Sequence, residues 1–301
     1  MTPQQTVTAG IDGSPESLAA ADWAAREALR RDLPLHLVHA FDQPAERSRL
    51  PEIEVPFHRE SGALDRAVLQ LSGAHPDLGI LDEQVTGPPV RALLEATGSS
   101  ALLVLGSQGF GALEGALVGS VALAVAARCS CPVVLVRAEK HGKGKGKGKG
   151  KGKGNGKDEK GEREDSVTGP PRPVVLGLDL HRPCDELLEF AFRTAALHRT
   201  SLQVVHTWTV PLVPSADATE PADAKSRLLT AALTPWRNKF PGTQVTERLV
   251  RGMAGHHLVK AAAGADLLVI GRRDPAEDRL GATAHSVIHH AKCPVAVIAH
   301  S

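Results

Sequence analysis

The first half of the chain recurs in its second half as a series of short landmarks in the same order. LVLG returns as LVIG, and CPVVLV returns as CPVAVI. An aspartate ending an apolar run is followed 27 residues later by a histidine in both halves, as Asp12–His39 and as Asp179–His206. This repetition predicts two copies of one domain, in line with the two domains expected from 301 residues. We refer to residues 1–138 as repeat 1 and to residues 171–301 as repeat 2.

Residues 139–170, between the repeats, have almost no apolar side chains, and residues 142–153 are six Gly-Lys pairs. We expect a disordered linker, because little apolar area is present to offset the entropy of ordering. No GK pair in it is followed by Ser or Thr, which excludes a P-loop. The regular lysines favour a solvated segment, and contact with nucleic acid is a weaker alternative.

The formal net charge of +1 argues against a surface that binds polyanions over its whole extent. The sequence has no apolar stretch long enough to span a membrane and no signal-peptide pattern at its start. Its four cysteines lack CxxC spacing. These features predict a soluble protein of the reducing cytoplasm, without membrane contact.

Each repeat alternates strand-like and helix-like segments. In repeat 1, apolar runs predict strands at 7–11, 35–40, 80–86, 101–105 and 133–136. Helical spacing and cap residues predict helices at 15–31, 58–72, 90–97 and 120–128. The fold class is therefore α/β: two tandem doubly wound domains, each with a five-stranded parallel sheet and about four helices.

Glycines follow the fourth strand of repeat 1 and precede its last helix. Gly106 and Gly109 lie just past the strand, and Gly119-Ser120 opens the helix. Glycine lets a ligand approach the main chain closely, and the amides of a first helical turn favour an anion. The pattern indicates a phosphate cradle, although a tight turn without any ligand is the alternative.

Two further segments end at the same edge of the predicted sheet. Asp12 and Ala40, like Gly106, stand at carboxyl ends of parallel strands. Ligands of doubly wound sheets bind beyond these ends, near the topological switch point. Three segments thus converge on one crevice, although Asp12 also suits a capping or turn role before Ser14, which is compatible with a ligand.

These residues resemble the universal stress protein family over both repeats. The resemblance is carried by Asp12, the strand at 35–39, Gly87-Pro88, Gly106-x2-Gly109-x9-Gly119-Ser120, and CPVV at 131–134. It implies a fold of the adenine nucleotide alpha hydrolase type. It also implies an adenine nucleotide as ligand, either ATP, with or without Mg²⁺, or AMP or a cyclic nucleotide.

The resemblance also implies roles for individual residues. Gly106, Gly109, Gly119 and Ser120 would hold the ribose and phosphates. Asp12 would lie beside the nucleotide, and the main chain around Ala40 would meet the adenine edge. Position 108, often arginine in the family, is glutamine here, which puts a side-chain contact to phosphate in doubt.

Repeat 2 departs further from the glycine pattern. Gly271 and Gly281 are retained, but Asp274 replaces the second glycine and Ala282 replaces the serine. A carboxylate facing phosphate adds like-charge repulsion, and the lost hydroxyl removes a donor. Arg272 and Arg273 would offset part of this repulsion. We expect repeat 2 to bind nucleotide weakly or not at all.

The remaining chemistry-bearing residues favour structural roles. His285 and His289 have metal-ligand spacing, but no third ligand accompanies them, so a solvated or capping pair is favoured over a metal site. Cys129-x-Cys131 suits a redox pair, although buried packing is favoured. We expect no catalytic residue, because no nucleophile and base stand at interpretable spacing.

The sequence thus predicts an ATP-binding stress-response regulator without enzymatic activity. The resemblance further implies that repeat 2 is an intramolecular pseudo-dimer partner, because family members commonly pair through the last strand, here at 133–136 and 295–298. Further homo-oligomers stay open. The alternatives are a nucleotide-free protein-interaction module of the same fold and, less favoured, a weak ATPase.

Overall fold

The computed structural model describes residues 5–41, 58–107, 118–138, 171–181, 184–209, 222–272 and 279–300. The expected linker and Gly109 therefore lie outside the described residues. No helix in the described part is long and apolar enough to cross a membrane.

Both repeats alternate strands and helices, as predicted. Repeat 1 contains β1 (Thr6–Gly10), α1 (Pro15–Arg31), β2 (Leu35–Phe41), α2 (His58–Ala74), β3 (Ile80–Thr86), α3 (Pro89–Ala96), β4 (Ser100–Gly106), α4 (Ser120–Arg128) and β5 (Val133–Val136). Repeat 2 contains β6 (Val174–Gly177), α5 (Asp185–Leu197), β7 (Leu202–Trp208), α6 (Ala222–Lys239), β8 (Val245–Arg251), α7 (Ala254–Ala261), a 3-10 turn (Ala262–Gly264), β9 (Leu267–Arg272), α8 (Ala282–His290) and β10 (Val295–Ala299). The predicted α/β class in two tandem domains is confirmed.

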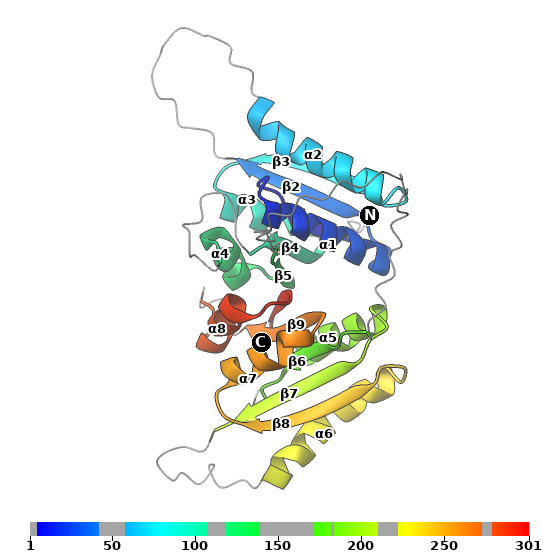
Figure 1. Ribbon diagram of the computed structural model, residues 1–301, viewed down its shortest axis with the longest axis vertical. Helices are drawn as coiled ribbons and strands as arrows, with labels where there is room; N and C mark the ends of the chain where they lie inside the picture. The colour runs from blue at the N-terminus through cyan, green and yellow to red at the C-terminus, as the bar shows by residue number, and fades with distance from the viewer. Residues whose placement is uncertain are drawn as a thin grey trace, which may run out of the picture.

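The strands form a single sheet across both repeats (Figure 1), in the order β3-β2-β1-β4-β5-β10-β9-β6-β7-β8. Among the described strands, pairing is parallel within each repeat and antiparallel only between β5 and β10, where Val297 lies opposite Val133 and Val295 opposite Leu135. All four residues of β5 are buried. The two five-stranded sheets thus share their apolar edges, which would otherwise expose unpaired backbone groups.

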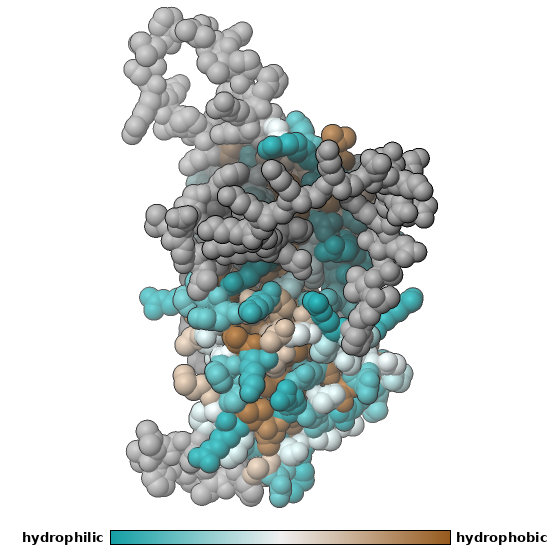
Figure 2. Space-filling model, in the orientation of Figure 1, coloured by the Kyte–Doolittle hydropathy of each residue, from teal (hydrophilic) through white to brown (hydrophobic). Residues whose placement is uncertain are grey.

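Two hydrophobic layers cover the sheet, one on each face. One layer contains residues from α1, α2, α5 and α6, and the other contains residues from α3, α4, α7 and α8. Each layer includes residues of both repeats, so the core is continuous across the joint. On the face shown in Figure 2, hydrophobic residues are visible between hydrophilic ones in the lower half, over repeat 2.

Two arginines cap helix C-termini across the joint. Arg272 of repeat 2, which is buried, donates to the carbonyls of Ala127 (2.8 Å) and Cys129 at the end of α4. Arg137 of repeat 1 donates to the carbonyls of Ile288 (2.9 Å) and His289 (2.7 Å) in α8. The last carbonyls of a helix lack partners within the helix and carry partial negative charge, so each arginine satisfies a helix of the other repeat.

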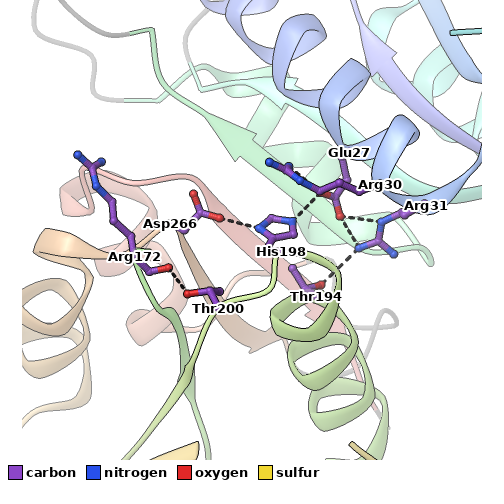
Figure 3. Close-up of polar contacts among 8 residues, drawn as sticks. All are labelled: Glu27, Arg30, Arg31, Arg172, Thr194, His198, Thr200 and Asp266. Carbon is purple, nitrogen blue, oxygen red and sulfur yellow. Dashed lines mark hydrogen bonds and ion pairs between the residues drawn. The ribbon is translucent and has the colours of Figure 1, made fainter. Parts of the chain in front are cut away.

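An ion cluster, buried at Glu27 and His198 and partly exposed at Asp266, joins the repeats on the opposite face (Figure 3). The His198 ring, with a side chain 3% exposed, lies between Glu27 of α1, 2.7 Å from Nε2, and Asp266 of repeat 2, 2.6 Å from Nδ1. Arg31 is 2.7 Å from the other oxygen of Glu27 and also donates to Thr194 at 3.3 Å. Two carboxylates, one on each ring nitrogen, favour a doubly protonated, charged histidine.

The pKa values of the cluster follow from this geometry. Burial opposes the charge of Glu27, but the bonds from His198 and Arg31 outweigh it and lower its pKa to about 2. Burial likewise opposes the charge of His198, yet its bonds to Asp266 and Glu27 raise its pKa above 6.5. The bond from His198 lowers the pKa of Asp266. The cluster is therefore held together by charge.

Candidate functional site

The register of the sheet brings the predicted strand-end residues of repeat 1 to one edge. In β1, Gly10 lies opposite Val38 of β2, and Ala9 lies opposite Val104 of β4. Continuing this register by two residues sets Asp12 level with Ala40 and close to the end of β4 at Gly106. The predicted convergence of these three segments therefore agrees with the strand pairing.

Asp12 organises the turn between β1 and α1. Its Oδ1 accepts hydrogen bonds from the Ser14 backbone N–H (2.9 Å) and from the Ser14 hydroxyl (2.5 Å). The Ser14 oxygen in turn accepts from the backbone N–H of Ser17 (3.1 Å), which makes Ser14 the N-cap of α1. Asp12 therefore stabilises the turn before Ser14, while Ser14 itself caps the helix, and Asp12 stays exposed at the sheet edge.

His39 fixes the same turn from β2. Its Nδ1 is 2.7 Å from the carbonyl oxygen of Ile11, the residue before Asp12, and its Nε2 is buried without a hydrogen-bond partner in the described structure. His206 repeats this contact with Leu178 at 2.9 Å in repeat 2. The spacing of 27 residues therefore has a structural cause: each histidine holds the strand end that carries the aspartate.

Gly106 lets α1 approach the end of β4. A Cβ at this position would lie 2.8 Å from the Glu16 carbonyl carbon and 2.9 Å from the Ser17 nitrogen. These are backbone atoms and cannot move aside as a flexible side chain would. Gly106 is consequently required for packing, and this packing carries the α1 turn with Asp12 to the edge.

The start of α4 lies at the same edge. The backbone N–H of Gly119 donates to the carbonyl of Ser107 (2.7 Å), directly after β4. Gly119 is the N-cap of α4 and supplies no side-chain acceptor to the first turn, while Ser120 is exposed. The first-turn amides and the positive end of the helix dipole suit an anion. Five of the six predicted residues thus lie in the described structure.

Repeat 2 contains a cavity of about 760 Å³ at the matching edge. Its lining includes Gly177 and Leu178 at the end of β6 and just past it, Trp208 at the end of β7, and Gly281 and Ala282 at the start of α8. The indole of Trp208 has the Lys225 amine 6.0 Å and the Arg251 guanidinium 5.8 Å from its ring centroid. Its lining residues come from strand ends, helix starts and His300, so no single stretch of the sequence displays this cavity.

The repeat 2 crevice differs from that of repeat 1 beside the glycine that follows its last apolar strand residues, Gly271. The His300 ring fills the space beside Gly271, so that a Cβ there would lie 2.5 Å from Nε2. Counting from the Cys-Pro landmark, the repeat 1 counterpart of His300 is Ala138. Asp179 accepts a hydrogen bond from the His181 backbone (3.1 Å). Asp274 lies outside the described residues, so the effect assigned to it stays a prediction.

The structure also shows the geometry of the histidine pair and the cysteine pair singled out in the sequence. The rings of His285 and His289 lie 4.3 Å apart, and the described residues contain no group of three or more metal-ligating side chains. All four cysteines are free thiols. The Sγ atoms of Cys129 and Cys131 lie 3.3 Å apart, a proximity that the sequence spacing alone did not establish.

Known proteins resemble this chain over both repeats. A model of the universal stress protein family matches residues 4–137 and 171–299. A universal stress protein of Mycobacterium tuberculosis (strain H37Rv) is 28% identical over 317 residues, covering 99% of this chain and 98% of that protein. The crystal structure of a universal stress protein from Archaeoglobus fulgidus has a TM-score of 0.64 at 17% identity, covering 98% and 96% of the two chains. A universal stress protein solved in complex with cAMP is 30% identical, covers 46% of this chain and 99% of its own, and has a TM-score of 0.37.

Proposed function

This chain belongs to the universal stress protein family, and from that membership we propose that repeat 1 binds ATP or another adenine nucleotide. The protein acts in the cytoplasm as a stress-response regulator without enzymatic activity. Repeat 2 serves mainly as the partner that completes the sheet and the core.

The observation that supports this proposal is the start of α4 beside the ends of β1, β2 and β4. The first turn of α4 has no side-chain cap, and Ser120 offers an exposed hydroxyl. Phosphate oxygens would accept from these amides and from this hydroxyl. The main chain around Ala40 would meet the base, and Gly109 would allow close approach of the phosphates.

The residues at this edge also fit the metal that ATP carries. Mg²⁺ usually keeps several waters and is held by substrate phosphates plus one or two carboxylates. Asp12 is the exposed carboxylate of the β1–α1 turn, and one of its oxygens is engaged by Ser14. Mg²⁺ would therefore arrive with the triphosphate, with Asp12 as the protein carboxylate beside it, and would neutralise phosphate charge.

The sharpest test places a competing carboxylate at the start of α4. Gly119 has φ −74° and ψ 150°, a conformation that suits an aspartate N-cap. In Gly119→Asp the new carboxylate accepts from the first-turn amides and repels phosphate. ATP binding by isothermal titration should weaken roughly tenfold or more, which corresponds to about 1.4 kcal/mol. An N-cap aspartate favours the helix, so the variant should stay folded.

The matched control is Gly281→Asp at the start of α8, where φ is −64°, ψ is 162° and no atom lies within 4 Å of a new Cβ. It should leave ATP affinity unchanged. The absence of saturable binding by the parent protein, for ATP and for cAMP, would overturn the proposal and favour the nucleotide-free interaction module. Turnover above background that is lost in Asp12→Ala would instead indicate a weak ATPase.

The cavity of repeat 2 supports a second candidate site. Its volume of about 760 Å³ and the face of Trp208 suit an aromatic ligand. His300 and Ala282 make its phosphate end poorer than that of repeat 1. If ATP binding survives Gly119→Asp and falls in Gly281→Asp, the site lies in repeat 2 and the assignment to repeat 1 is wrong.

A further inference from the structure

Two thiols face each other where α4 leads into β5. The Sγ atoms of Cys129 and Cys131 are 3.3 Å apart, and the Cys129 thiol also lies 3.7 Å from the hydroxyl oxygen of Thr97. A disulfide bond is about 2.05 Å long, so the two sulfurs need to approach by only roughly 1.2 Å. Cys129 is 1% exposed and Cys131 is partly exposed, so the pair lies just beneath the surface.

The surroundings separate the acidities of the two thiols. The hydrogen bond from Cys131 is the largest cause that lowers the pKa of Cys129, to about 6, against the opposing effect of burial. The bond to Thr97 and the charge of Arg272 act in the same direction. The same hydrogen bond between the two sulfurs, together with burial, raises the pKa of Cys131. One thiolate, on Cys129, is therefore stabilised beside one neutral thiol.

We propose that Cys129 and Cys131 form a redox-active pair that a peroxide oxidises to an intramolecular disulfide. The Cys129 thiolate attacks one oxygen of hydrogen peroxide. The O–O bond breaks, Cys129 becomes a sulfenic acid, and the departing hydroxide takes up a proton to leave as water. Cys131 then attacks Cys129 Sγ, the S–O bond breaks, and a second water leaves with the Cys131 proton. Two thiols lose two electrons, and one peroxide becomes two waters.

The pair lies at a contact between the repeats. Arg272 of repeat 2 donates to the carbonyl of Cys129 and, at 2.8 Å, to that of Ala127. Drawing the two sulfurs together changes the turn that presents the Cys129 carbonyl. Ser120 begins α4, and Cys129 directly follows its last residue, so the cysteine pair lies at the opposite end of this nine-residue helix from the proposed phosphate contacts.

The chain supplies its own control in Cys293, the repeat 2 counterpart of Cys131. Ala291 stands where repeat 1 has Cys129, so Cys293 has no partner at this spacing. Burial raises the pKa of Cys293 to about 11. A thiol that is protonated at neutral pH and has no neighbouring cysteine should react slowly with peroxide.

The experiment treats the reduced full-length protein with hydrogen peroxide, alkylates the remaining thiols and digests with trypsin. Cleavage after Arg128 and Arg137 releases CSCPVVLVR, which holds both cysteines. This peptide should lose alkylation at least about tenfold faster than the peptide starting at Cys293, and should be lighter by two hydrogens. Dithiothreitol should restore both alkylation sites.

Two variants identify the step taken by each thiol. In Cys131→Ser the sulfenic acid on Cys129 has no resolving thiol, so dimedone should label residue 129 after peroxide treatment. In Cys129→Ser neither a disulfide nor dimedone labelling at 131 should appear. The proposal is overturned if CSCPVVLVR and the Cys293 peptide lose alkylation at the same rate. It is equally overturned if oxidation of the parent yields only disulfides between chains.

Discussion

At Gly106 the missing side chain serves packing first, because the backbone of α1 fills the space where a Cβ would lie. From the sequence, Gly106 was predicted to follow a strand and to be a glycine because it forms part of a phosphate cradle. The structure adds an independent reason, the close approach of the α1 turn. Both can hold at once, since the same approach brings Asp12 and the α4 start to one edge.

We predict that Gly106→Ala destabilises the protein by about 1–3 kcal/mol, because the methyl group would overlap backbone atoms of Glu16 and Ser17. Urea unfolding measures the change. The control is Gly62→Ala in α2, where no atom lies within 4 Å of the new methyl. That variant should gain about 0.5–1 kcal/mol from helix propensity. Equal effects of the two substitutions would contradict the packing role of Gly106.

Side-chain contacts at turns were the features least predictable from the sequence. The spacing of 27 residues between Asp12 and His39 was visible, but the bond from His39 to the Ile11 carbonyl was not. The same holds for Cys129 and Cys131, whose spacing fits either a packed or a facing pair. Side-chain direction in a turn depends on the surrounding packing, which one sequence does not specify.

At the scale of elements, local sequence features were sufficient to predict where several helices and strands begin and end. Ser14 and Pro15 predicted the start of α1, and the structure has Ser14 as its N-cap and Pro15 as its first residue. The predicted bounds of β3, α4 and β5 agree with the structure to the residue. Caps, apolar runs and prolines act within a few positions, so a sequence displays them directly. The arginines that cap helices of the other repeat are distant in sequence from those helices, so the sequence did not predict these contacts.

We predict that Arg272→Met costs about 1.5–3 kcal/mol, because it leaves the buried carbonyls of Ala127 and Cys129 without their charged donor. Methionine keeps most of the side-chain volume. Arg137→Met, at a partly exposed arginine, removes equivalent bonds to Ile288 and His289 and should cost less, since water can replace the donor. Urea unfolding of both variants checks the order, and a larger loss in Arg137→Met would contradict it.

At the scale of the molecule, the joint between the repeats combines three kinds of contact. The β5–β10 pairing supplies backbone hydrogen bonds, the two arginines cap helices, and the His198 cluster adds buried charge. Internal repetition predicted the two domains, and the family resemblance implied the strands at 133–136 and 295–298 as the pairing edges. The cluster joins Glu27 to a histidine 171 positions away, a pairing that no local pattern displays.

The cluster predicts a pH dependence of stability with a defined sign. The folded pKa of His198 lies above its unfolded value of 6.5, so its contribution is complete below pH 6.5 and is lost as pH rises through the raised value. The pKa of Glu27 is lowered from 4.5 to about 2, so its contribution is complete above pH 4.5 and is lost as pH falls towards 2. Asp266 follows the same sign as Glu27. The cluster should therefore stabilise the joint most between pH 4.5 and 6.5.

We predict that His198→Asn lowers the stability by about 3 kcal/mol at pH 5.5, because Glu27 keeps Arg31 and Arg30 but loses its buried cation. The difference from the parent should shrink as the pH rises from 5.5 through the raised pKa of His198, because the parent histidine then also loses its charge. Urea unfolding midpoints of both proteins across this range measure it. Arg91→Gln, which breaks an exposed pair with Glu95, is the control and should change little at any pH. A difference that stays constant with pH would show that His198 acts through packing alone, because only a titrating charge makes the loss depend on pH.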